Sequence, residues 1–169
     1  MDSKSLGNQR GLRALTLIES SGLRGLTIHE PYATLICEGD KKYETRSWAP
    51  PLSRIGEPLL IHAAKKWDKH VKDNINYVTE FLGIKEYDFK GRLGKVLGIA
   101  VLDEYEMILS QKYTKLEEEL GNFGTGQYAW RLRPVFLFDT PIQCTGMQRF
   151  WKVPDDLREK LKNSTGRRI

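Results

Sequence analysis

Apolar and polar residues alternate in several short stretches of the chain, and this alternation predicts β-strands. Leu26 and Ile28 alternate with Thr27 and His29 in the first predicted strand, residues 23–29. The other predicted strands cover residues 43–48, 58–63, 96–102 with an extension through 105–108, 128–138 and 148–153. Pro134 is expected to bend the strand in which it lies.

Helical spacing of apolar residues predicts helices between some of these strands. Pro31 starts a short helix that carries Tyr32, Leu35 and Ile36 on one face, and Gly39 ends it. The other expected helices cover residues 65–82, 113–120 and 154–162. About six short strands with irregularly placed helices predict an α+β fold, namely a small closed or half-closed barrel with peripheral helices.

Length and composition predict one soluble domain. The chain has 169 residues, of which 40% are hydrophobic, enough for a core. No apolar run approaches the ~20 residues that span a bilayer, and the polar N-terminus does not resemble a secretory signal. We therefore expect no membrane association and a cytoplasmic protein, or a nuclear one if the source is eukaryotic. Cys37 and Cys144 are interpreted as thiols rather than as a disulfide framework.

The positive charge of the chain lies mainly at its ends. The net charge is +5, and the last segment, residues 158–169, contributes +4 of it. We interpret that segment as a basic tail, residues 1–22 as a weakly ordered lead-in, and residues 23–157 as the domain. Within the neutral body, residues 41–72 hold eight basic and three acidic residues. They predict a basic face that attracts a polyanion, with solvated surface charge as the alternative.

The densest group of reactive side chains is Lys41, Glu44 and Arg46, beside His29 and Tyr32. Glu44 and Arg46 are two apart on a strand, so they point to the same face. A carboxylate beside a guanidinium stays ionised and well oriented. Lys41 directly precedes the strand, where it can point into a cleft. The set predicts a site that binds phosphate or positions a water molecule. The alternative is a purely structural Glu44–Arg46 ion pair.

Aromatic residues form a second group, which consists of Trp48, Phe123, Tyr128, Trp130 and Trp151. Single-stranded nucleic acid is often held by stacking on such side chains, at about 1–3 kcal/mol per base. An aromatic residue on an alternating strand is more often part of the core, and this is the favoured interpretation of Trp130 and Trp151. Tyr128 follows a flexible loop and is the better candidate for stacking.

The remaining patterns predict neither a metal nor a cofactor. The histidines, His29, His62 and His70, lack paired ligand spacing. The glycine-rich loop over residues 121–126 lacks the Lys-Ser/Thr ending of a phosphate-binding loop, so it is only a weak candidate for substrate contact. The sequence also contains no G-x-S-x-G motif.

Two motifs together resemble the ASCH domain family of the PUA-like superfamily. The stretch Leu26-Thr27-Ile28-His29-Glu30-Pro31-Tyr32-Ala33 resembles the family opening, commonly Leu-Ser-Ile-x-Gln-Pro-Trp/Tyr-Ala, with Glu30 in place of the glutamine. The signature G-x-K-x-x-E-x-R follows at the expected distance, with its fixed positions filled by Gly39, Lys41, Glu44 and Arg46. The resemblance spans about residues 23–153.

The resemblance implies a PUA-like β-barrel with a cleft lined by the signature residues. Family members are associated with RNA binding, transcription coactivation and, in some cases, ribonuclease activity. We therefore expect an RNA- or single-stranded-DNA-binding or processing module, with ribonuclease activity as one option. Lys41 and Glu44 are the candidate catalytic residues. The candidate binding residues are His29, Tyr32, Arg46, Trp48, Lys65, Lys66, Lys69 and Tyr128.

Two alternatives remain open at this stage. A similar group of small proteins hydrolyses acetylated cytidine with a threonine three residues after the lysine and a glutamate on a later strand. Here Glu44 occupies the first position, Thr45 is one residue away, and Asp103 or Glu104 is the candidate for the second. The other alternative is a non-catalytic interaction domain of the transcription-coactivator type, which captures a protein partner through the basic tail.

Overall fold

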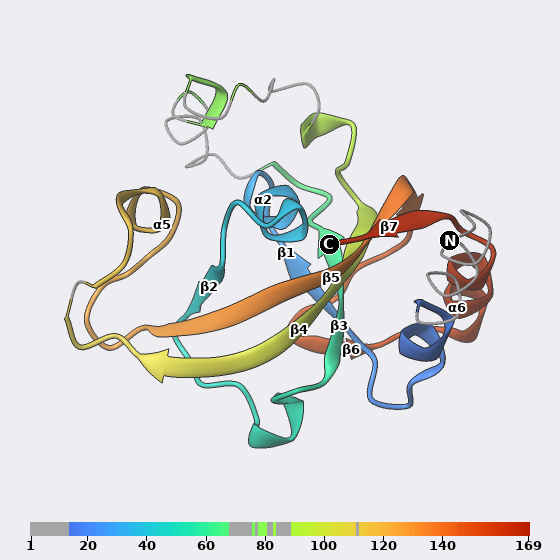
Figure 1. Ribbon diagram of the computed structural model, residues 1–169, viewed down its shortest axis with the longest axis horizontal. Helices are drawn as coiled ribbons and strands as arrows, with labels where there is room; N and C mark the ends of the chain where they lie inside the picture. Colours follow the sequence, from blue (N-terminus) through green and yellow to red (C-terminus); the bar gives the residue numbers. More distant parts are fainter. Residues whose placement is uncertain (1–13, 68–75, 77, 81–82, 84–88, 111) are drawn as a thin grey trace, which may run out of the picture.

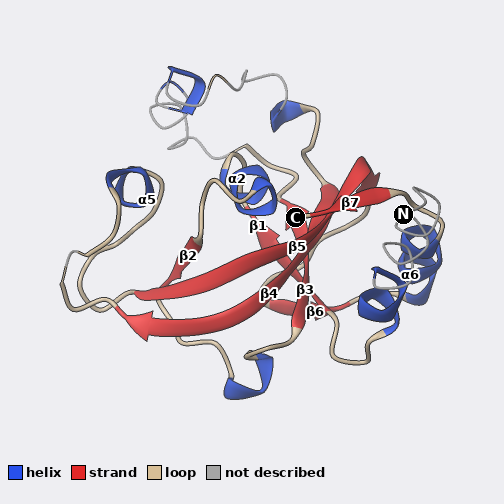
Figure 2. Cartoon of the chain, viewed as in Figure 1, coloured by secondary structure: helices blue, strands red, loops and turns tan. Residues whose placement is uncertain are grey.

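The fold combines one strongly curved sheet with a few short helices (Figures 1 and 2). A computed structural model describes residues 14–67, 76, 78–80, 83, 89–110 and 112–169. Its elements are β1 (Arg24–Ile28), α2 (Tyr32–Glu38), β2 (Tyr43–Arg46), the 3₁₀ turn η1 (Leu52–Arg54), β3 (Pro58–Ala63), β4 (Lys95–Met107), α5 (Lys115–Glu119), β5 (Tyr128–Gln143), β6 (Phe150–Lys152), α6 (Asp155–Lys162) and β7 (Gly166–Arg168). Residues 14–19 are also helical.

The sheet has the strand order β2-β5-β4-β3-β1-β6, and β7 pairs with β5 outside this path. β1 and β3 run parallel, while the other paired strands are antiparallel. The long strand β5 pairs with β2 near its start and with β7 farther along. The sheet curls into a half-barrel, which confirms the predicted α+β class. The sequence patterns did not predict β7.

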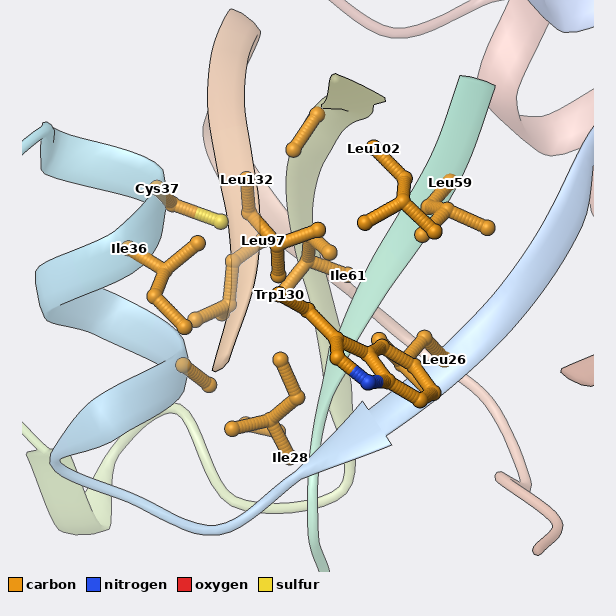
Figure 3. Close-up of a cluster of buried hydrophobic side chains, with 13 residues drawn as sticks. Leu26, Ile28, Ile36, Cys37, Leu59, Ile61, Leu97, Leu102, Trp130 and Leu132 are labelled. Carbon is orange, nitrogen blue, oxygen red and sulfur yellow. The ribbon is translucent and has the colours of Figure 1, made fainter. Parts of the chain in front are cut away.

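Two hydrophobic clusters lie on opposite faces of the sheet. The first joins Ile36 and Cys37 of α2 to inward side chains such as Leu26, Ile61 and Trp130 (Figure 3). The second joins the other face to α6 and to the helical residues 14–19. All six residues of β3 are buried because both of its faces are covered. Trp130 and Trp151 are core residues, as favoured above.

Helix α2 forms as predicted. Gly39 ends it with a φ of 89°, a left-handed conformation that glycine adopts without strain, and its N–H donates to the Ile36 carbonyl. Leu35 faces away from the barrel and packs with Val78, Phe89 and Leu120. The helix therefore connects the barrel core to the segment that follows α5.

Three local features differ from, or refine, the predicted elements. Lys65 and Lys66 form a bend and Trp67 has no regular structure, so the expectation that a helix begins at Lys65 is wrong. Residues 76 and 78–80 are helical, and the rest of the expected helix lies outside the described residues. Pro134 does mark an irregularity, because Ala100 pairs with Pro134 whereas Ile99 pairs with Phe136.

Both ends of the described chain pack against the second cluster. Ala14 and Ile18 of the helical residues 14–19 are buried there, together with Leu157 and Leu161 of α6. The basic segment 158–169 thus includes part of α6 and the strand β7. In the part of the chain that the structure describes, every helix is too short or too polar to cross a membrane.

Candidate functional site

A cavity of about 380 Å³ opens where β1, β2 and the segment after α5 meet. Four predicted site residues, His29, Tyr32, Glu44 and Arg46, line it. The other lining residues are Thr45, Leu120, Gly121 and Asn122. We call this cavity the cleft. His29 follows the end of β1 and is exposed, while Tyr32 begins α2 and is half-buried.

Arg46 connects two strands that are not neighbours in the sheet. Its Nη2 donates to the carbonyl oxygen of Thr27 on β1 at 3.0 Å. Its Nε lies 2.9 Å from Oε1 of Glu44, as expected for two side chains on one face of a strand. That contact is an ion pair without hydrogen-bond geometry, because the buried Nε makes no hydrogen bond to any described residue. The remaining guanidinium surface and the Glu44 carboxylate line the cleft.

Lys41 does not line the cleft. Its side chain is 1% exposed, and Nζ donates to Oε2 of Glu117 at 2.8 Å. The ammonium also lies 5.4 Å from the ring centroid of Phe123. The structure therefore separates Lys41 from Glu44 and Arg46. Glu117 was not predictable from the sequence, because no local pattern links two residues 76 positions apart.

The segment 120–122 lies beside β2 and forms one wall of the cleft. The Asn122 N–H donates to Oγ1 of Thr45 at 3.0 Å. A Cβ atom at Gly121 would lie 2.7 Å from the Phe123 ring and 3.3 Å from Oγ1 of Thr45, so only glycine fits without displacing a neighbour. The glycine-rich loop thus contributes Gly121 and Asn122 to the lining of the cleft, and its contact with a substrate stays a prediction.

Two aromatic candidates lie elsewhere. Trp48 packs edge-on against Trp130, with 4.6 Å between ring centroids, and against Phe150 at 5.8 Å. The ring centroid of Tyr128 lies 6.2 Å from that of Tyr105. Both candidates are half-buried. Tyr128 is the cross-strand partner of Arg46 in the β2–β5 ladder, although neither Tyr128 nor Trp48 lines the cleft.

The basic candidates lie at the edge of the sheet beside His29. Lys65 and Lys66 are exposed and follow β3, which runs parallel to β1. The N–H of Ala64 donates to the carbonyl of Ile28 at 2.8 Å, so the residues after both strands emerge at one edge. Lys69 lies outside the described residues. Of the eight basic residues counted above, Lys41 and Arg46 are paired with carboxylates, so the basic face is smaller than the sequence suggested.

Glu30 is a buried carboxyl group that lies in the chain between two residues of the cleft lining, His29 and Tyr32. Its Oε2 accepts from the Thr34 N–H at 3.0 Å and its Oε1 from the Thr34 hydroxyl at 2.7 Å. Burial is the main reason that the pKa of Glu30 rises from its ordinary value of 4.5 to about 7. The two hydrogen bonds from Thr34 partly offset this rise in pKa, and Arg92, which donates to Thr34 and Glu38, offsets it further. The sequence signalled this site only by the departure from glutamine.

The two acidic candidates for a hydrolase site do not reach Lys41. Asp103 pairs with Arg133 and Glu104 with Arg131, both at 2.9 Å. Glu104 and Glu117 instead line a second, larger cavity of about 830 Å³, which also holds Tyr43 and Tyr113. Across the described ranges, no three His, Cys, Asp or Glu side chains gather in a way that could hold a metal ion.

Comparisons with known proteins agree with the motifs and the fold. The family model of the ASCH domain matches residues 26–131. A crystal structure of a serine-to-alanine mutant of ASCH from Zymomonas mobilis has a TM-score of 0.50 and 15% sequence identity, covering 85% of this chain and 97% of that chain. The structure titled as ASCH from the same organism has a TM-score of 0.49 and 15% identity, covering 86% and 98%. At this identity the likeness concerns the fold alone. The chain belongs to the ASCH domain family.

Proposed function

We propose that this ASCH domain binds single-stranded RNA or DNA and holds one unpaired nucleotide in the cleft. The observation that carries the proposal is the convergence of Tyr32, Glu44 and Arg46 on one cavity. Its volume of about 380 Å³ falls within the range of small-ligand pockets, about 300–1,000 Å³. Double-stranded nucleic acid would not present a free base to such a cavity.

Each lining group has a role that its chemistry supports. The Tyr32 ring is a stacking surface for a base, and the Glu44 carboxylate accepts hydrogen bonds from a base amino group. The Arg46 guanidinium binds phosphate through the N–H groups that do not contact Thr27. Lys65 and Lys66 attract the neighbouring phosphates from the edge of the sheet.

The test is fluorescence anisotropy with a labelled single-stranded oligonucleotide across a salt series. Replacing both lysines, Lys65→Ala with Lys66→Ala, should reduce the salt slope by about 1.4, because each lost phosphate contact on a single strand removes about 0.7. Lys152→Ala with Lys160→Ala is the matched control, since both residues are exposed and lie on β6 and α6. Equal slopes for the two double variants would contradict the proposal.

Ribonuclease activity is a second candidate, and one observation favours it. His29 and Glu44 line the same cavity, and an imidazole with a carboxylate can act as a general acid and base. We expect cleavage of labelled RNA but not of the matching DNA, because attack within the strand requires the 2′-hydroxyl. His29→Ala should abolish cleavage and retain binding. Intact RNA after prolonged incubation with the wild type would reject this candidate.

Hydrolysis of an acylated nucleoside receives less support from the geometry. The reaction assigned to the similar hydrolases needs the lysine beside the substrate, whereas Lys41 is buried and bonded to Glu117. We therefore expect no turnover of acetylated cytidine by the wild type, measured by the change in nucleoside absorbance. If the wild type hydrolyses acetylated cytidine and Lys41→Ala abolishes this turnover, the hydrolase would be favoured over the nucleic-acid-binding module.

A further inference from the structure

A buried ion pair joins the family signature to helix α5. The side chains of Lys41 and Glu117 are 1% and 5% exposed, and their charged atoms are 2.8 Å apart. A charge buried this deeply is tolerated only when its partner is present and well placed. The pair therefore fixes the distance between two segments that are far apart in the chain.

Both carboxylate oxygens of Glu117 are used in this connection. Oε2 accepts from Lys41 Nζ, and Oε1 accepts from the backbone N–H of Lys42 at 2.5 Å. The carbonyl of Lys42 in turn accepts from the N–H of Leu132 on β5 at 2.9 Å. On the helical side, the Thr114 hydroxyl accepts from the N–H of Glu117 and caps α5. Helix α5 is thus held to the backbone at the start of β2.

The wall of the cleft begins directly where α5 ends. Leu120 is buried against Leu35 of α2, and the Asn122 N–H donates to Thr45 on β2. Residues 120–122 therefore have three attachments: the ion pair through α5, the packing of Leu120 against Leu35, and the Thr45 hydroxyl. If α5 moved outward, this wall would move away from Tyr32 and Arg46.

We propose that Lys41 and Glu117 are positioning residues, which hold residues 120–122 at the distance required to enclose a nucleotide. Lys41 acts through Glu117 and makes no contact with the ligand. This inference rests on the proposed function for its binding readout, whereas the position of the wall can be measured without any ligand. Glu117 thereby becomes part of the site although it does not line the cleft.

The test exploits the difference between removing one charge and removing both. Lys41→Met leaves a buried carboxylate without a partner, and Glu117→Gln leaves a buried ammonium without one. The combined variant, Lys41→Met with Glu117→Gln, is neutral, and the new amide can still accept from the Lys42 N–H. Loss of one partner is strongly destabilising, whereas replacement of both by apolar residues of similar volume is often tolerated. Glutamine is used at position 117 because the Lys42 N–H needs an acceptor.

One measurement reports the position of the wall, and a second reports ligand binding. Amide hydrogen exchange of Asn122, measured by NMR, reports whether its bond to Thr45 persists. Anisotropy with the single-stranded oligonucleotide reports binding. In both single variants we expect the amide hydrogen of Asn122 to exchange at least tenfold faster than in the wild type. Both should also bind the oligonucleotide at least tenfold more weakly. The combined variant should recover both values to within threefold of the wild type. Lys115→Met with Glu119→Gln, at exposed positions of the same helix, should match the wild type.

The outcomes separate this proposal from direct contact by Lys41. If Lys41 binds a phosphate, the combined variant stays weak and its salt slope falls by about 0.7, which overturns the proposal. Unchanged Asn122 exchange in both single variants overturns it as well. If the wild type binds no oligonucleotide but exchange follows the expected order, the proposed function fails while the positioning role is supported.

A further variant keeps the test decisive if the single-charge variants do not fold. Thr45→Val removes the hydroxyl that accepts from Asn122 and leaves the ion pair intact. We expect faster exchange of Asn122 and weaker binding, with an unchanged circular dichroism spectrum. Full binding by a folded Thr45→Val protein would mean that the wall does not contribute to the site, and this would overturn the proposal.

Discussion

Replacing Glu30 with glutamine tests whether this buried carboxyl group opposes folding at neutral pH. Glu30 is 1% exposed, and both of its oxygens accept from Thr34. Glutamine has nearly the same shape and keeps one acceptor for the Thr34 N–H. Its amide group can donate to the Thr34 hydroxyl, which also accepts from Arg92. The substitution therefore removes the charge with little change in packing.

The sign of the effect follows from the pKa. Burial raises the pKa of Glu30 in the folded protein from 4.5 to about 7, so the folded state binds this proton more tightly than the unfolded state. The resulting stability is fully present below pH 4.5 and is lost as the pH rises through about 7. At about 1.4 kcal/mol for each pH unit between the two pKa values, the loss is roughly 3 kcal/mol.

The assay is urea unfolding of the wild type and the Glu30→Gln variant at pH 5 and pH 8. We expect the variant to be more stable at pH 8 by roughly 3 kcal/mol, with a midpoint of thermal unfolding about 6–12 °C higher. At pH 5 the difference should be small. Glu119→Gln, an exposed control, should show no such dependence. The reasoning would be refuted if the difference in unfolding free energy between Glu30→Gln and the wild type were no larger at pH 8 than at pH 5.

Three more predictions concern other buried groups. Burial lowers the pKa of His62, so the contribution of this side chain to stability should fall as the pH drops below about 6.5, opposite in sign to that of Glu30. Measured by urea unfolding in the Glu30→Gln background, His62→Gln should flatten this slope. Gly98→Ala places a Cβ 2.5 Å from the Phe136 carbonyl oxygen, and unfolding should become easier by about 1–3 kcal/mol. Burial raises the pKa of Cys144 to about 11, so alkylation at pH 8 should be much slower than for a free thiol, as mass spectrometry would show.

Local patterns predicted those parts of the fold that local forces decide. The left-handed cap at Gly39 follows from the conformational freedom of glycine, and the shared face of Glu44 and Arg46 follows from the two-residue period of a strand. The buried strand β3 was predicted with its observed limits because its apolar run has clear boundaries. These features need no knowledge of which segments meet in space.

Features that depend on distant segments were not predictable in this way. The Lys41–Glu117 pair joins a residue before β2 to a residue of α5, 76 positions later in the chain. The sequence around either residue does not indicate that the other is its partner. The lysine therefore was expected in the cleft, while the structure buries it behind the wall. Strand β7 was missed because its three residues, Gly166–Arg168, are polar and gain their extended form only by pairing with β5.

The pairing of β7 with β5 covers a stretch of β5 that would otherwise be an open strand edge. β7 covers the backbone of Phe136, Leu137 and Phe138, which would otherwise present open hydrogen-bonding groups on an apolar stretch. An uncovered edge of this kind recruits strands from other molecules and leads to aggregation. The arginine side chains of β7 are exposed and repel a second copy of the same strand. We therefore expect removal of residues 166–168 to expose this strand edge and to increase aggregation, which light scattering would detect.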